Sequence, residues 1–358
     1  MSNAGPTPED QLAFLGNIER LLLEGQFVAS YKYALLLALV DLAVRLGQDD
    51  SSELDVPLDD IAQGFIELYW RQCAPYNTGV RDGDAGMLMQ NTGSQAKLIT
   101  VVDALRVACP SLGNARKSPL WQPTIRSVMK IVEDMPLWRL QHLRSGDCAF
   151  LYPRMLRKNC IRLKPGVAAN LRRFHGFIVR MVESEWLRFI QSLPSNAHVL
   201  GPTADLEQFL FGSDRGRLAE MVAPLSEVQH GQCFYCSRNI AMPEVDHFVP
   251  WVRYPADLAY NLVLACRSCN QNKKDLLAAE AHLERWLIRN DRQAIAIETA
   301  GIEAGLVVDL ARTVRVAEWA YTRTSFSEAA VWVAQDTTGL LVGQWHVLLT
   351  NTEQSMLP

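Results

Sequence analysis

Four of the eight cysteines are arranged in two C-x-x-C pairs, Cys233 with Cys236 and Cys266 with Cys269. Each pair forms a tight turn that can direct both sulfur atoms at one ion, and 29 residues separate the pairs. Four thiolates complete a tetrahedral set for Zn²⁺, and such a closed set is structural because no coordination position is left for a substrate. The spacing therefore predicts a structural zinc site rather than disulfide bonds.

Between the two pairs lie residues that could perform acid–base and metal chemistry. Asp246 and His247 stand at the end of a β-rich run that Pro250 closes, and Asn270 follows the last cysteine. An imidazole exchanges protons near neutral pH, so His247 could take a proton from water. Asp246 and Asn270 offer hard oxygen ligands, which suit Mg²⁺ or Mn²⁺ better than zinc. These residue types could together support acid–base chemistry assisted by a divalent metal ion.

The motifs C-x2-C, V-D-H-F-V-P, N-L and C-x2-C-N-x2-K follow one another over residues 233–274. In this order they resemble the HNH endonuclease family, in its zinc-stapled ββα-metal (treble-clef-like) form. The resemblance implies that His247 is the general base, that Asp246 and Asn270 hold one catalytic Mg²⁺ or Mn²⁺ ion, and that Asn261 positions the loop and the histidine. Asn270 stands where the family often has a histidine, which makes this an HNN variant. Only about one seventh of the chain is covered.

Several other interpretations of these residues stay open. Adjacent residues of a strand point to opposite faces, so Asp246 and His247 can serve one site only if the backbone bends there or if the phosphate lies over the end of the strand. His247 could instead be a buried core histidine. Asn270 could cap a helix and Asn261 could occupy a turn.

The charge distribution indicates a nucleic-acid partner in spite of a net charge of −4. Residues 148–182 contain no Asp or Glu and eight Lys or Arg residues. Such a run is a candidate surface for phosphates, although an ordinary solvated face would have the same composition. The predicted nucleic-acid contacts in this run and beside the motif are Arg154, Arg157, Lys158, Arg172, Arg173, Arg253, Arg267, Lys273 and Lys274. We expect DNA as the partner, with RNA left open.

Length and composition indicate a globular protein of several domains. The chain has 358 residues, of which 49% are hydrophobic and 21% charged. The first 15 residues lack the basic and apolar regions of a secretory signal, and the longest apolar stretch, 34–40, is too short to cross a membrane. We therefore expect a cytoplasmic protein without a membrane partner.

The fold class that we expect is mainly α with a small α+β module. Apolar residues at helical spacing predict a helical N-terminal domain at 1–193, with helices from about 31, from 59, over 96–108, after Pro123 and over 165–193. A connection at 194–226 contains a short helix at 206–211. The HNH domain is expected at 227–292, with a helix starting at Lys274, and a helical C-terminal region at 293–358 with a helix over 304–321.

Three functions fit these observations. The first is an endonuclease that cuts DNA, and analogy with similar standalone proteins suggests a restriction or anti-phage defence effector. The second is a zinc-finger module that binds nucleic acid without cutting it. The third is an inactive scaffold. A pure binding finger has no need of Asp246, His247, Asn261 and Asn270 at these spacings, so the sequence favours the nuclease. The helical N-terminal domain would then serve recognition or regulation, including a homodimer or partner-protein contact.

Overall fold

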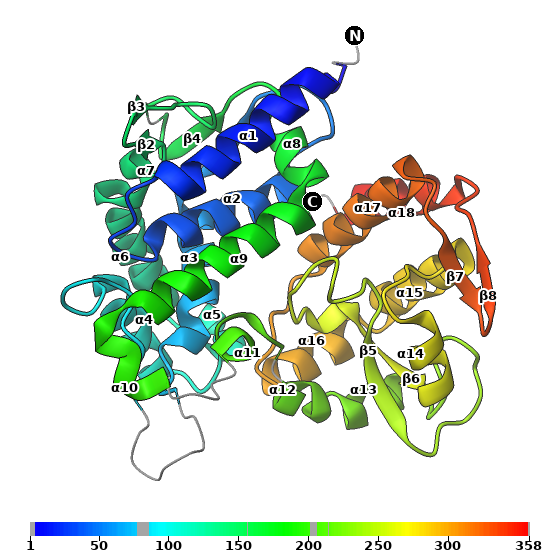
Figure 1. Cartoon of the computed structure of the whole chain (residues 1–358). Helices are drawn as coiled ribbons and strands as arrows, with labels where there is room; N and C mark the ends of the chain where they lie inside the picture. The colour runs from blue at the N-terminus through cyan, green and yellow to red at the C-terminus, as the bar shows by residue number, and fades with distance from the viewer. Residues whose placement is uncertain (1–3, 77–85, 156, 201–205, 214, 357–358) are drawn as a thin grey trace. The chain divides into compact units, whose positions relative to one another are not determined.

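The computed structural model describes residues 4–76, 86–155, 157–200, 206–213 and 215–356 (Figure 1). This part of the chain is mainly α, with small two-stranded antiparallel sheets. The chain divides into two compact units, which we call the N-terminal unit (Met1–Pro110 and Ala115–Gly212) and the C-terminal unit (Ser111–Asn114 and Ser213–Pro358). No helix in the described ranges combines the length and the apolar character that a membrane span needs.

The N-terminal unit is a bundle of helices around one central helix. Its helices and strands are α1 (Pro8–Glu24), α2 (Tyr31–Leu46), β1 (Leu54–Pro57), α3 (Leu58–Gln72), α4 (Lys97–Ala108), α5 (Leu112–Lys117, whose first residues belong to the other unit), α6 (Trp121–Asp134), α7 (Pro136–Arg139), β2 (His142–Leu143), β3 (Gly146–Asp147), β4 (Cys160–Leu163), α8 (Val167–Arg173), α9 (His175–Ser192), η1 (Pro194–Asn196), α10 (Ala197–Leu200) and α11 (Leu206–Phe211).

Helix α2 is the central helix because its sequence is apolar on every side. Helices α3, α8 and α9 pack around it, so most of its side chains are buried. Trp186 of α9 packs against Tyr33 of α2 and Tyr69 of α3, and its indole N–H donates to Gln90 at 3.1 Å. The apolar stripes of the sequence therefore form the core of this unit.

The C-terminal unit contains a β-hairpin followed directly by a helix. Its helices and strands are α12 (Arg215–Glu220), α13 (Val222–Val228), β5 (Pro243–His247), η2 (Ala259–Asn261), β6 (Leu262–Cys266), α14 (Arg267–Lys273), α15 (Glu280–Arg292), α16 (Ala294–Glu303), α17 (Leu310–Phe326), β7 (Val331–Ala334), β8 (Thr337–Gly339) and α18 (Gln344–Met356). Strands β5 and β6 pair antiparallel, from Pro243 opposite Cys266 to His247 opposite Leu262. Helix α14 packs against both strands, which gives a ββα arrangement.

The elements after the ββα arrangement pack onto it. Trp286 of α15 stacks on Phe248 with ring centroids 4.7 Å apart. Trp332 of β7 donates its indole N–H to Asn272 of α14 at 2.7 Å. The backbone N–H of Ala279 donates to the carbonyl of Trp332 at 2.8 Å. The elements from α15 onward thus belong to the same compact unit as the hairpin and α14.

Several helices begin or end at other residues than the sequence predicts. The helix expected over 165–193 is two helices, because the backbone of Phe174 leaves the helical region between α8 and α9. Lys274 has a φ of 48°, which ends α14, so the next helix begins at Glu280. The helix expected over 304–321 is α17, which Asp309 caps by accepting from the N–H of Arg312 at 2.8 Å. The described part of the segment 194–226 contains η1, α10, α11, α12 and the beginning of α13, which ends at Val228.

Candidate functional site

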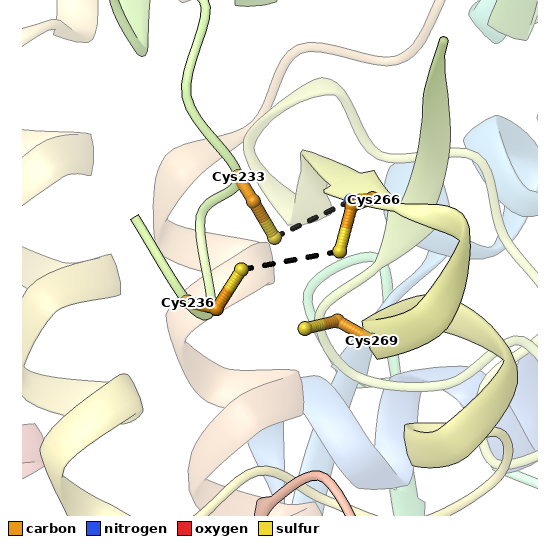
Figure 2. A group of neighbouring side chains, drawn as sticks. All are labelled: Cys233, Cys236, Cys266 and Cys269. Atoms are coloured by element: carbon orange, nitrogen blue, oxygen red, sulfur yellow. Dashed lines mark hydrogen bonds between the residues drawn. The ribbon is translucent and has the colours of Figure 1, made fainter. Parts of the chain in front are cut away.

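The four cysteines of the two C-x-x-C pairs come together at one end of the hairpin (Figure 2). Their sulfur atoms all lie within 4.8 Å of one another, and Sγ of Cys236 is 3.9 Å from Sγ of Cys266. A tetrahedral zinc ion with Zn–S bonds of about 2.3 Å places its sulfur ligands about 3.8 Å apart. The cluster could therefore hold a structural Zn²⁺ ion.

The local backbone explains how the four sulfur atoms are positioned. Cys233 donates its N–H to Arg238, and Ser237 donates to Cys233, which closes the first turn at 2.9 Å in both cases. Cys266 ends β6 and directs its N–H at Sγ of Cys233 at 3.3 Å, while Cys269 lies one turn into α14. Burial raises the pKa of the Cys233 and Cys269 thiols. A bound cation would supply the charge that stabilises both thiolates.

His247 is the last residue of β5, and its contacts come from the loop that follows. Its Nε2 is 2.9 Å from Oδ1 of Asp257, and its ring centroid is 5.4 Å from that of Trp251. The hydroxyl of Ser213 lies 3.0 Å from both carboxylate oxygens of Asp257. We did not expect Asp257, Ser213 or Trp251 from the sequence. The sequence does offer one signal for Asp257, because it is the one carboxylate residue between His247 and Asn261.

Asn261 holds the segment after His247 in place. It is 2% exposed. Its Oδ1 accepts from the N–H of Val249 at 2.8 Å and its Nδ2 donates to the carbonyl of the same residue at 2.9 Å. The N–H of Phe248 donates to the carbonyl of Asn261 at 2.8 Å. Three hydrogen bonds therefore fix the two residues that follow the histidine.

Asp246 contacts a different set of residues from its neighbour His247. Its Oδ2 lies 3.0 Å from the ammonium of Lys273 and accepts from the hydroxyl of Tyr235 at 2.5 Å. Burial and the negative charge of Asp246 raise the pKa of Tyr235, so that hydroxyl remains a donor. Since side chains alternate along a strand, Asp246 and His247 lie on opposite faces of β5.

Asn270 lies on α14 beside the face of β5 that carries Asp246. Its Nδ2 donates to Oε2 of Glu244 at 2.8 Å. Glu244 is two residues before Asp246 and thus on the same face of the strand. Asp246, Asn270 and Glu244 form one group of oxygen donors, whereas His247 lies with Asp257.

Two family models match the chain. Residues 11–210 match the model described as "Domain of unknown function (DUF8808)", which is more than half of the chain. The chain belongs to the DUF8808 family. Residues 233–276 match the HNH endonuclease model, so the chain carries an HNH endonuclease domain around the four-cysteine cluster. No curated protein and no solved structure matches the chain.

In the HNH domain of this DUF8808 protein, the basic side chains predicted to contact nucleic acid differ in their exposure to solvent. Lys273 is 0% exposed and donates to the carbonyl of His247 at 3.0 Å as well as binding Asp246, so the expectation that it contacts phosphate is wrong. Arg253 is half-buried and donates to Thr324 at 2.9 Å. Arg267 and Lys274 are exposed and remain candidates for phosphate contact.

In the DUF8808 domain, too, some of the basic residues predicted to contact nucleic acid are buried or paired and others are exposed. Arg172 is 1% exposed; it pairs with Asp49 at 2.9 and 3.0 Å and donates to the carbonyls of Val44 and Gly47 at the end of α2. The expectation that Arg172 contacts nucleic acid is therefore wrong, since it stabilises the end of a core helix. Arg154 is exposed but pairs with Asp147 at 3.0 Å. The exposed side chains are Arg157, Lys158 and Arg173.

Proposed function

We propose that this chain is a metal-dependent endonuclease that hydrolyses phosphodiester bonds in DNA, with His247 as the general base. The observation that carries the proposal is the position of His247, at the loop end of the hairpin whose other end carries the four-cysteine cluster, with one ring nitrogen on a carboxylate. The HNH endonuclease match supports a nuclease-type function and a nucleic-acid substrate.

The Asp257 carboxylate orients the imidazole for this role. When Nε2–H donates to Asp257, the lone pair of the ring lies on Nδ1, which can then take a proton from the attacking water. The carboxylate also stabilises the imidazolium that forms. Asn261 keeps this arrangement in place because it fixes the backbone directly after the histidine.

The residues that would hold the catalytic Mg²⁺ or Mn²⁺ ion are Asp246 and Asn270. Because Asp246 and His247 lie on opposite faces of β5, the proposal requires that the scissile phosphate lie over the end of the strand, within reach of both. Together with Glu244 they offer two carboxylates and one carboxamide, which is the donor chemistry that hard divalent cations prefer. A bound ion would stabilise the negative charge that develops on the departing oxygen. Lys273 already neutralises Oδ2 of Asp246 from inside the domain, and Oδ1 accepts no hydrogen bond from a described residue.

Cleavage of plasmid DNA, linear duplex, single-stranded DNA and RNA tests the proposal. We expect the wild-type chain to cut DNA in the presence of Mg²⁺ or Mn²⁺ and to stop when a mild chelator removes the ion. His247→Ala should lower the rate at least about 100-fold, because a general base contributes 10²–10⁴. The control is His198→Ala, which changes an exposed histidine of the other unit. A His247→Ala variant that cuts at the wild-type rate would refute the base assignment.

The same assay separates the nuclease from the alternative function. A zinc-finger module that only binds nucleic acid predicts a shifted electrophoretic band without cleavage for both wild type and His247→Ala. We propose further that the protein acts in the cytoplasm as a restriction or anti-phage defence effector, on the analogy of a helical domain ahead of an HNH domain. The corresponding test is phage plating on cells that express the wild type or His247→Ala.

A further inference from the structure

Lys32 is a largely buried lysine that has no charged partner among the described residues. It lies in the first turn of α2 and is 7% exposed. Among the described residues its ammonium has no ion pair or hydrogen bond, and its contact is the ring of Phe27 at 5.3 Å from the centroid. Burying a charged group without pairing is costly, so such a position calls for an explanation.

Arg139 adds a second positive charge beside Lys32. It ends α7, which packs against α2. Arg139 is exposed, and no ion pair joins it to a described residue. Burial and the neighbouring charge of Arg139 lower the pKa of Lys32 to about 8. The two positive charges therefore act on each other, and no described acidic side chain pairs with either.

Other basic residues of the same unit show that this arrangement is unusual. Arg172 is also buried, and it pairs with Asp49 through two hydrogen bonds. Arg162 pairs with Asp55 at 2.6 Å. These cations have their counter-charge within the domain, whereas no described residue supplies one to Lys32 or Arg139.

We propose that Lys32 and Arg139 form a phosphate-binding site in the DUF8808 domain. A phosphate group would supply the missing negative charge, with the ammonium acting as a point charge and the guanidinium as a bidentate donor. The phosphate could belong to a free nucleotide or to a nucleic-acid backbone, since both present the same group. This site lies in the N-terminal unit and thus goes beyond the cleavage proposed for the HNH domain.

Thermal unfolding of the full chain in inorganic phosphate tests the site, with sodium chloride at equal ionic strength as the reference. We expect phosphate at a hundredfold its Kd to raise Tm by roughly 5 to 10 °C. Lys32→Met should abolish this rise. It should also leave Tm in chloride unchanged or higher, because it removes an unpaired buried charge. A role limited to packing on Phe27 predicts the opposite, a lower Tm in chloride.

Two further variants sharpen the test. Arg139→Gln should weaken phosphate binding about tenfold or more, in line with the loss of a charge-assisted contact. Arg126→Gln is the matched control, because Arg126 is an exposed arginine of α6. It should behave as the wild type. His247→Ala should keep the phosphate response, so a failure of the proposed nuclease chemistry does not affect this result.

A nucleoside triphosphate and a short duplex oligonucleotide identify the source of the phosphate. If Lys32→Met loses oligonucleotide affinity, the site holds a backbone phosphate; if it loses only triphosphate affinity, the ligand is a free nucleotide. Either loss supports the site. A wild-type protein whose Tm and calorimetric titration show no response to phosphate, triphosphate or oligonucleotide beyond that of chloride overturns it.

Discussion

Replacing Lys273 by methionine should strongly destabilise the HNH domain. The Lys273 ammonium is fully buried and lies 3.0 Å from Asp246 and 3.0 Å from the carbonyl of His247. Methionine fills a similar volume but leaves Asp246, whose side chain is 11% exposed, with only the Tyr235 hydroxyl as a partner among the described residues. The carboxylate would then be an uncompensated charge inside the domain.

The expected loss is large for a single substitution. Breaking one side of a buried ion pair costs about 3 to 5 kcal/mol. For a unit of this size each kcal/mol lowers Tm by about 2 to 4 °C, so the zinc-loaded variant should melt about 6 to 20 °C below the wild type. Asp246→Asn combined with Lys273→Met should recover part of this loss, since no charge is then left unpaired.

The neighbouring Lys274 provides a matched control. It is exposed, so Lys274→Met should change the free energy of unfolding by no more than about 0.5 kcal/mol. The measurement is thermal and urea unfolding of the full chain, with zinc content checked by elemental analysis. If Lys273→Met melts within 2 °C of Lys274→Met, as a rough margin of error, the buried ion pair contributes nothing and the reasoning is refuted.

Two further predictions concern the zinc cluster and the histidine partner. Purified protein should contain about one zinc ion per chain, and stripping it with a strong chelator should unfold the hairpin, because metal binding to a closed thiolate set stabilises the fold. Zinc-free protein with an unchanged Tm would exclude a structural role for the cluster. Asp257→Asn should lower kcat about 10- to 100-fold with little change in KM, because it disturbs the orientation of His247 rather than substrate binding. A proportional rise in KM at constant kcat would instead assign Asp257 to the substrate.

The four-cysteine cluster and the hairpin could be predicted because their determinants are local. The two residues between the cysteines of each pair fix the separation of their sulfur atoms. The β-rich run before His247 and the run before Cys266 lie on either side of one loop, so their pairing follows from their order. The helices α2 and α11 likewise follow from short stretches of apolar spacing.

The partners of the candidate catalytic residues could not be predicted because they depend on the folded chain. Asp257 approaches His247 only because the loop returns to the hairpin, and Ser213 reaches Asp257 from 44 residues earlier. The pairing of β1 with β4 joins Asp55 to Arg162 across 107 residues. The break at Phe174 also depends on packing, since the apolar spacing continues through it.

Burial separates neighbouring basic residues that look equivalent in the sequence. Successive residues of a helix are about 100° apart, so Arg172 faces α2 while Arg173 faces solvent, and Lys273 and Lys274 differ in the same way. The acid-free run 148–182 also obtains counter-charges from outside itself, since Asp49 and Asp55 neutralise Arg172 and Arg162. Local charge counts therefore overestimate the phosphate-binding surface of this run. They also miss Lys32, which lies outside the run, in an apolar helix, and which has no acidic partner in the described part of the chain.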